Sequence, residues 1–187
     1  YDSFGGGDYL SPGEERHTPR RALVQIANDV SLQLGTGPLL LSAVATEPDL
    51  WRRFRQRLDE AAAALSHGAI LLIVIDAADN ATYAASRRNE RAFVEDMWEL
   101  QLPANVRLLM TCRTHRLNEI SPPDGIDQYL LAGFDIEAST CMLRTRFVDA
   151  TPADGLLFHE RTHGVPRVQA YLLAANESDS LVELLRR

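Results

Sequence analysis

The chain has 187 residues, with 26 acidic side chains against 19 basic ones and a formal net charge of −7. Hydrophobic residues make up 45% and charged residues 24%, which excludes a disordered or fibrous protein and fits one or two globular units. The negative charge argues against general nucleic-acid binding, because clustered basic residues hold phosphate backbones. We therefore expect no direct nucleic-acid partner.

Several absences narrow the possible chemistry further. The longest apolar run, residues 69–75, is far shorter than the roughly 20 residues of a membrane-spanning helix, and no secretory signal pattern begins the sequence. We expect a cytoplasmic protein without a membrane partner. Cys112 and Cys141 are too few for a disulfide framework or a metal knuckle. All 19 basic residues are arginine, so the sequence has no lysine for a phosphate-binding loop or a Schiff base.

The first part of the chain opens with a short aromatic segment and continues into two helices. Residues 1–4 are typical of the end of a strand, as if cut from something longer, and a glycine turn over residues 5–7 follows. Apolar residues at helical spacing predict a helix over residues 20–34, which Gly35 ends. Asp49 is the expected N-cap of a second helix that runs through Leu65.

Two predicted strands come next. Residues 69–75 are an unbroken apolar run, the pattern of a strand covered on both faces in a parallel sheet. A helix over about residues 83–100 follows, then a second buried strand over residues 106–110 and a short helix around residues 115–120. Residues 128–131 are a further candidate strand.

The rest of the chain has helical patterns only, and these cover residues 136–148, 152–163, 166–175 and a last turn from residue 181. Strands and helices alternate first and helices alone follow. This order predicts an α/β parallel-sheet core over residues 1–133 and a small helical subdomain over residues 134–187.

Two carboxylates follow the first buried strand: Asp76 stands directly after it and Asp79 three residues later. In open parallel sheets ligands bind at the carboxyl ends of the strands, so both side chains are expected at the ligand edge. Their oxygens suit a Mg²⁺ ion that bridges nucleotide phosphates. A strand that ends at an Asp capping a turn is the structural alternative.

The second buried strand ends in Thr111 and Arg113. A hydroxyl and a guanidinium at this edge suit phosphate oxygens, because arginine offers a planar fork of donors. An exposed polar strand end is the simpler explanation. We favour the functional interpretation because the two strand ends, their order along the chain and their spacing all point to the same kind of site.

Together these segments resemble one family of nucleotide-binding proteins. Residues 70–81 resemble the Walker B motif of P-loop ATPases, most closely that of the STAND class with its AAA+ and NACHT relatives, and residues 106–113 resemble the sensor strand of that class. The resemblance implies that Asp76 holds the magnesium shell and that Asp79 polarises the attacking water. It implies that Thr111 and Arg113 sense the γ-phosphate. Asn80 departs from the acidic residue that many members carry there.

A third match lies in the helical part. Residues 162–167, with Gly164, Val165 and Pro166, resemble the Gly-x-Pro motif of the helical subdomain of STAND ATPases, in which the proline packs against adenine. Proline suits this place because its missing N–H costs nothing in the first turn of a helix. A plain helix break of Gly and Pro is the alternative.

The resemblance covers about residues 1–175 but only part of the family's domain. Family members place a strand, a Gly-rich loop with Lys-Ser/Thr and a helix before the segment that matches residues 1–4, and residues 5–7 are no substitute because Asp8 and Tyr9 follow them. The implied protein is part of an ATP-binding and ATP-hydrolysing switch of a signalling or defence regulator. Its implied ligands are ATP, ADP and Mg²⁺, and its implied partners are further copies or other domains of the chain. Without the P-loop we expect the piece to be inactive alone.

Two other functions are open. One is a nucleotide-free scaffold or interaction module. The other is a zinc metallopeptidase, because His159, Glu160 and His163 match the H-E-x-x-H pattern, in which two histidines one helical turn apart ligate zinc and the glutamate is the general base. Glu183 would be a conceivable third ligand. We rank this hypothesis last because it leaves the two polar strand ends unexplained.

Overall fold

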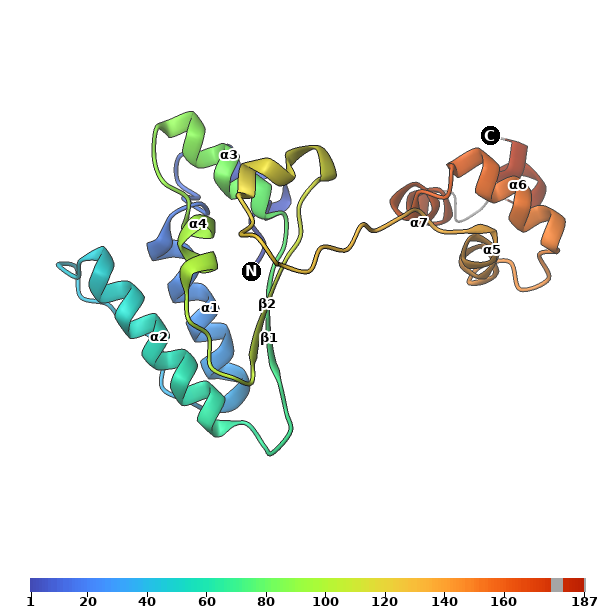
Figure 1. Cartoon of the computed structure of the whole chain (residues 1–187). Helices are drawn as coiled ribbons and strands as arrows, with labels where there is room; N and C mark the ends of the chain where they lie inside the picture. Colours follow the sequence, from blue (N-terminus) through green and yellow to red (C-terminus); the bar gives the residue numbers. More distant parts are fainter. Residues whose placement is uncertain (176–179, 187) are drawn as a thin grey trace. The chain divides into compact units, whose positions relative to one another are not determined.

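The computed structural model describes residues 1–175 and 180–186, and its chain divides into two compact units, Tyr1–Asp127 and Gln128–Arg187. It is a mixed α/β structure, mostly helical, with a two-stranded parallel sheet in the first unit (Figure 1). The sequence places the boundary slightly later, after residue 133. None of the helices in the described part of the chain combines the length and apolarity that crossing a bilayer requires.

The sheet consists of β1 (Leu71–Ile75) and β2 (Val106–Met110), which run parallel with Ile75 opposite Met110. The predicted second strand has the predicted bounds, but only its first residue, Val106, is buried, so the prediction of a buried strand is wrong there. The first strand begins two residues later than predicted. The N-terminal segment lies along the other edge of β1, where Asp2 and Asp76 form a parallel bridge. The backbone of Tyr1 accepts a hydrogen bond from Asp76 N at 2.8 Å. Residues 1–3 therefore extend the sheet by a short strand end.

Only one face of β1 is covered within the first unit, so the prediction of a strand buried on both faces is wrong. Leu71, Ile73 and Ile75 are buried, whereas Leu72 and Val74 are 54% and 36% exposed. Three helices lie on the buried side: α1 (Pro19–Leu34), α2 (Glu47–Ala64) and α4 (Phe93–Glu99) (Figure 1). An unbroken apolar run does not reveal this, because both faces of the strand carry the same residue types.

The two long helices of the first unit have well-defined ends. Helix α1 (Pro19–Leu34) begins after the N-cap Thr18 and ends at Gly35, whose φ of 67° places it in the left-handed region. Helix α2 (Glu47–Ala64) has Thr46 as its N-cap, not Asp49 as predicted. Asp49 instead completes a capping box at the third helical position. The prediction missed this because Thr and Asp are both good N-caps.

The helix predicted over residues 83–100 is two helices. Helix α3 (Ala78–Arg88) starts after a two-residue turn that follows β1, and α4 (Phe93–Glu99) follows a break at Asn89, which has a φ of 55°. Beyond the break, Phe93 N donates to the carbonyl of His17 at 3.0 Å. This long-range contact turns the chain, and the local periodicity does not contain it. Two 3₁₀ segments, η1 (Gly5–Leu10) and η2 (Thr114–Ile120), complete the unit.

The second unit contains four described helices: α5 (Ile136–Arg144), α6 (Pro152–Thr162), α7 (Pro166–Ala175) and α8 (Leu181–Arg186). They enclose a small core around Leu143 and Phe158. Helix α5 ends four residues before the predicted end, and residues 128–131 lie outside any strand.

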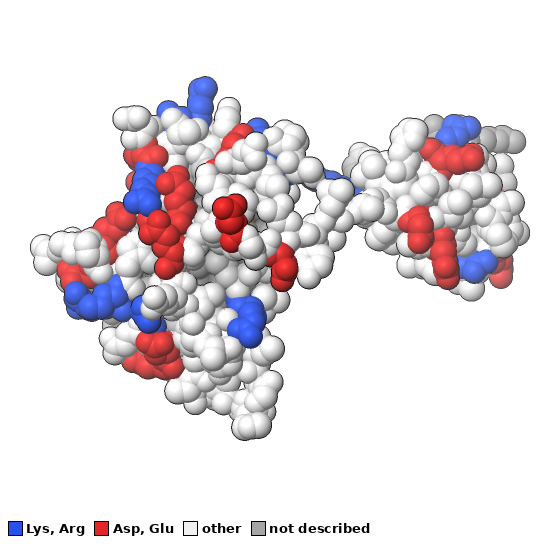
Figure 2. Space-filling model, in the orientation of Figure 1, with Lys and Arg blue, Asp and Glu red and all other residues white. Residues whose placement is uncertain are grey.

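Charged side chains of both signs are intermixed on the face of the molecule in Figure 2.

Candidate functional site

The carboxyl ends of β1 and β2 bring Asp76 and Thr111 together. Thr111 Oγ1 donates to Asp76 Oδ1 at 2.6 Å and accepts a hydrogen bond from Ala77 N at 2.9 Å. The register explains this, because both residues directly follow the paired Ile75 and Met110. The expectation that the two strands deliver these side chains to one edge is confirmed. Their roles toward a nucleotide stay predictions.

A strained turn links β1 to α3 at this edge. Ala77 lies in the left-handed region with φ 53° and ψ 45°, which costs a non-glycine residue about 1–2 kcal/mol. The hydroxyl of Thr111 and the carbonyl of Thr111, which accepts from Ala78 N at 2.8 Å, hold the turn in place. The turn places Asp79 and Asn80 in the first turn of α3, beside the end of β2.

Asp79 is a buried carboxylate that faces two arginines. It is 1% exposed, and its Oδ2 accepts a hydrogen bond from Arg113 Nε at 2.7 Å. Arg113 also donates to Asn80 Oδ1. Arg116 Nη1 lies 3.6 Å from the same Asp79 oxygen. The hydrogen bond to Asp79 raises the pKa of Arg113 above its usual value, so this guanidinium stays charged.

Sequence reasoning missed Arg116 and the aromatic residues beside it. The Arg116 guanidinium lies 4.8 Å from the centre of the Tyr83 ring, a cation–π arrangement. Tyr83 contacts Tyr9 and Tyr9 contacts Phe4, with ring centres 6.5 and 5.8 Å apart. The glycine-rich N-terminal loop therefore lies beside the two arginines. The available signal was that Arg116 follows Arg113 by three residues, on one side of a 3₁₀ turn.

The carboxylates fit a magnesium ion only in part. Asp76 is exposed at the sheet edge and can supply one oxygen, which suffices where nucleotide phosphates and water complete the octahedron. Asp79 is occupied by Arg113, so in this arrangement it is a counter-ion and not a base for water. Among the described residues, no three His, Cys, Asp or Glu side chains lie close enough together to hold a metal ion.

Pro166 belongs to the second unit, whereas the other four predicted site residues belong to the first. It is the first residue of α7, as the Gly-x-Pro match predicts for a proline in a first helical turn. Gly164 has a φ of 64°, and its carbonyl accepts from Phe134 N at 2.7 Å. A Cβ on Gly164 would lie 2.4 Å from the Phe134 carbonyl oxygen. The left-handed backbone and the close packing therefore account for glycine at this position without a bound nucleotide.

The H-E-x-x-H segment does not form the helical zinc arrangement. Helix α6 ends at Thr162, and His163 is its C-cap with φ 51°, so the two histidines do not share a continuous helix. His159 Nδ1 is 3.0 Å from the hydroxyl of the buried Ser139. Gln169 donates to the same hydroxyl at 2.8 Å. His159 thus belongs to a polar network that joins α5, α6 and α7.

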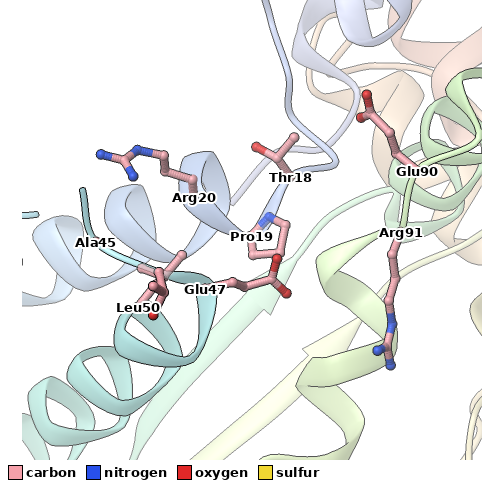
Figure 3. A pocket seen from close by; sticks show the side chains of 9 residues that line it. Thr18, Pro19, Arg20, Ala45, Glu47, Leu50, Glu90 and Arg91 are labelled. Atoms are coloured by element: carbon pink, nitrogen blue, oxygen red, sulfur yellow. The ribbon is translucent and has the colours of Figure 1, made fainter. Parts of the chain in front are cut away.

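A surface hollow lies elsewhere in the first unit, between the first turns of α1 and α2 (Figure 3). Its charged lining residues are Arg20, Glu47, Glu90 and Arg91. Arg20 and Arg91 extend away from one another in Figure 3. Glu90 binds the buried His17 at 2.5 Å, and Arg91 pairs with two acids of α4. Glu90 and Arg91 therefore already have partners within the protein. None of the predicted site residues lines the hollow.

No protein-family profile matches the sequence, and no curated protein matches it significantly.

Proposed function

We propose that residues 1–127 are part of the α/β core of a STAND-type ATP-dependent switch, and that the second unit is its helical subdomain. The observation that carries the proposal is the meeting of four polar side chains at one sheet edge. Asp76 is bonded to Thr111, and Asp79 is bonded to Arg113. Carboxylates at one strand end and a hydroxyl with a guanidinium at the next suit a magnesium-bound phosphate chain.

The uncovered parts of the sheet also support the proposal. In the first unit, all of whose residues are described, β2 pairs only with β1, so its other edge is open. The uncovered face carries apolar side chains: Ile70, Leu72, Val74 and Leu109. One further parallel strand followed by a helix would pair with β2 and cover this face. A phosphate-binding loop between such a strand and helix would lie at the carboxyl edge, beside Thr111 and one strand away from Asp76.

In this switch each residue has a distinct task. The nucleotide brings Mg²⁺ and its phosphates, and Pro166 would offer an apolar surface to the base. Asp76, kept in place by Thr111, orients the magnesium shell, and Arg113 reports the γ-phosphate. Asp79 would have to release Arg113 before it could polarise a water. Binding and hydrolysis would then change how the two units pack, with signalling or defence oligomers as the output.

The test is ATP and Mg²⁺ binding by titration calorimetry on the full-length natural protein. We expect Asp76→Ala to weaken Mg·ATP binding at least tenfold. The control is Asp59→Ala, which removes an exposed carboxylate from α2 and is expected to change nothing. Unchanged Mg·ATP binding in Asp76→Ala would refute the magnesium role. The reading frame upstream of Tyr1 is a second test, because the proposal requires Gly-x-x-x-x-Gly-Lys-Ser/Thr there.

One observation favours the alternative of a nucleotide-free scaffold. Asp79 and Asn80 already satisfy Arg113, and Asn80 cannot act as a catalytic base. A natural protein that lacks the phosphate-binding loop and does not bind ATP would fit this alternative.

A further inference from the structure

We propose that Arg116 is a positioning residue that serves as a reserve counter-ion for Asp79, so that Arg113 can leave this carboxylate for an anion such as phosphate. The identity of the anion rests on the proposed function. The exchange of counter-ions itself depends only on the contacts around Asp79.

The Asp79 carboxylate needs at least one arginine as a counter-ion. Its side chain is 1% exposed, and a buried ionised carboxylate without a partner carries a large desolvation penalty. Arg113 provides the present hydrogen bond at 2.7 Å. If Arg113 were the only partner, its departure would leave a bare buried charge, and the exchange would be strongly unfavourable.

The two arginine side chains differ in how exposed they are to solvent. The Arg113 side chain is 45% exposed, so it can turn toward solvent or a ligand. The Arg116 side chain is 20% exposed, stacks on Tyr83, and has its Nε 3.8 Å from Glu119 Oε1. Arg113 is therefore the partner that solvent or a ligand can reach, and Arg116 is packed beside the carboxylate.

Two buried atoms without hydrogen-bond partners would allow a direct ion pair between Asp79 and Arg116. Asp79 Oδ1 and Arg116 Nη1 are both buried and have no hydrogen-bond partner. Arg116 Nη1 already lies 3.6 Å from Asp79 Oδ2, and a charge-assisted hydrogen bond needs about 2.8 Å. A shift of less than about 1 Å would let Arg116 bond the carboxylate directly when Arg113 leaves.

The test is a double-mutant cycle on the 187-residue chain, with Arg113→Ala and Arg116→Ala alone and combined. Thermal unfolding is followed by tryptophan fluorescence, because both tryptophans, Trp51 and Trp98, lie in the first unit. We expect each single change to lower the Tm by about 3–5 °C and the pair to lower it by more than about 10 °C. Arg87→Ala, which removes an exposed arginine of α3, is expected to add without coupling to Arg116→Ala.

Asp79→Asn provides the decisive measurement, including the case in which the double variant does not fold. The amide keeps the shape of the side chain but removes its charge. We expect this change to lower the Tm of the wild type and to raise the Tm, or restore the folding, of the Arg113→Ala, Arg116→Ala chain. If the arginines had only a packing role, Asp79→Asn would not change from lowering the Tm in the wild type to raising it in the double variant. Additive single effects, or an Asp79→Asn change that fails to rescue the double variant, would overturn the inference.

These measurements use no nucleotide, so their result does not depend on whether the proposed function is correct. Coupling together with rescue by Asp79→Asn supports the reserve counter-ion even if the full-length protein does not bind ATP. The converse result is that the full-length protein binds ATP in a way that depends on Asp76 while the Tm values show no coupling between the arginines. That result overturns this inference and leaves the switch proposal in place.

Discussion

Replacing Thr111 by valine is expected to destabilise the first unit through two lost hydrogen bonds. Valine keeps the shape of the side chain but cannot donate to Asp76 or accept from Ala77 N, contacts of 2.6 and 2.9 Å. The bond to a charged group is weakened because Asp76 is exposed, so we assign about 1 kcal/mol to each bond. The free energy of unfolding should therefore fall by about 2 kcal/mol.

Urea unfolding followed by tryptophan fluorescence measures this loss. With an m-value of about 1–3 kcal/mol/M, the midpoint should move down by about 1 M. Thr111→Ser keeps the hydroxyl and loses one methyl group, so it should cost less than about 1 kcal/mol. In the Asp76→Ala background, Thr111→Val should cost only the bond to Ala77. A valine variant as stable as the wild type, or a serine variant that loses as much, would refute the bridging role of the hydroxyl.

Three further predictions concern other parts of the chain. Gly155→Ala should lower the Tm of the second unit by several degrees in circular dichroism, because its Cβ would lie 1.9 Å from Thr140 Oγ1; an unchanged Tm would show that α5 and α6 separate easily. Burial raises the pKa of Tyr1 to about 12, while the unfolded chain ionises near pH 10. Stability is thus complete below pH 10 and should fall by roughly 1–2 kcal/mol toward pH 12 after allowance for partial exposure, and the same fall in Tyr1→Phe would contradict this cause. Burial also raises the pKa of Cys112, so iodoacetamide at pH 8 should alkylate the exposed Cys141 first by mass spectrometry, and the opposite order would count against it.

Part of the candidate site was predictable from the sequence because it depends on neighbours along the chain. Two apolar runs of strand length, each followed by polar residues, were enough to place Asp76 beside Thr111 at one edge of a parallel sheet. The partners of Asp79 were not predictable in the same way. The burial of this carboxylate and its pairing with Arg113 depend on the turn at Ala77, whose left-handed backbone no residue type announces.

The sequence by itself determined most of the helix and strand segments of this protein, with the candidate strand over residues 128–131 as an exception, because helical periodicity, apolar runs, and Thr, Pro and Gly signals act over a few residues. The tertiary structure alone decided where α3 and α4 separate, which face of β1 is covered, and that Arg116 reaches Asp79. Each of these results depends on contacts between residues distant in sequence, such as Phe93 with His17. Such contacts arise only when the folded chain brings the elements together, so no local pattern encodes them.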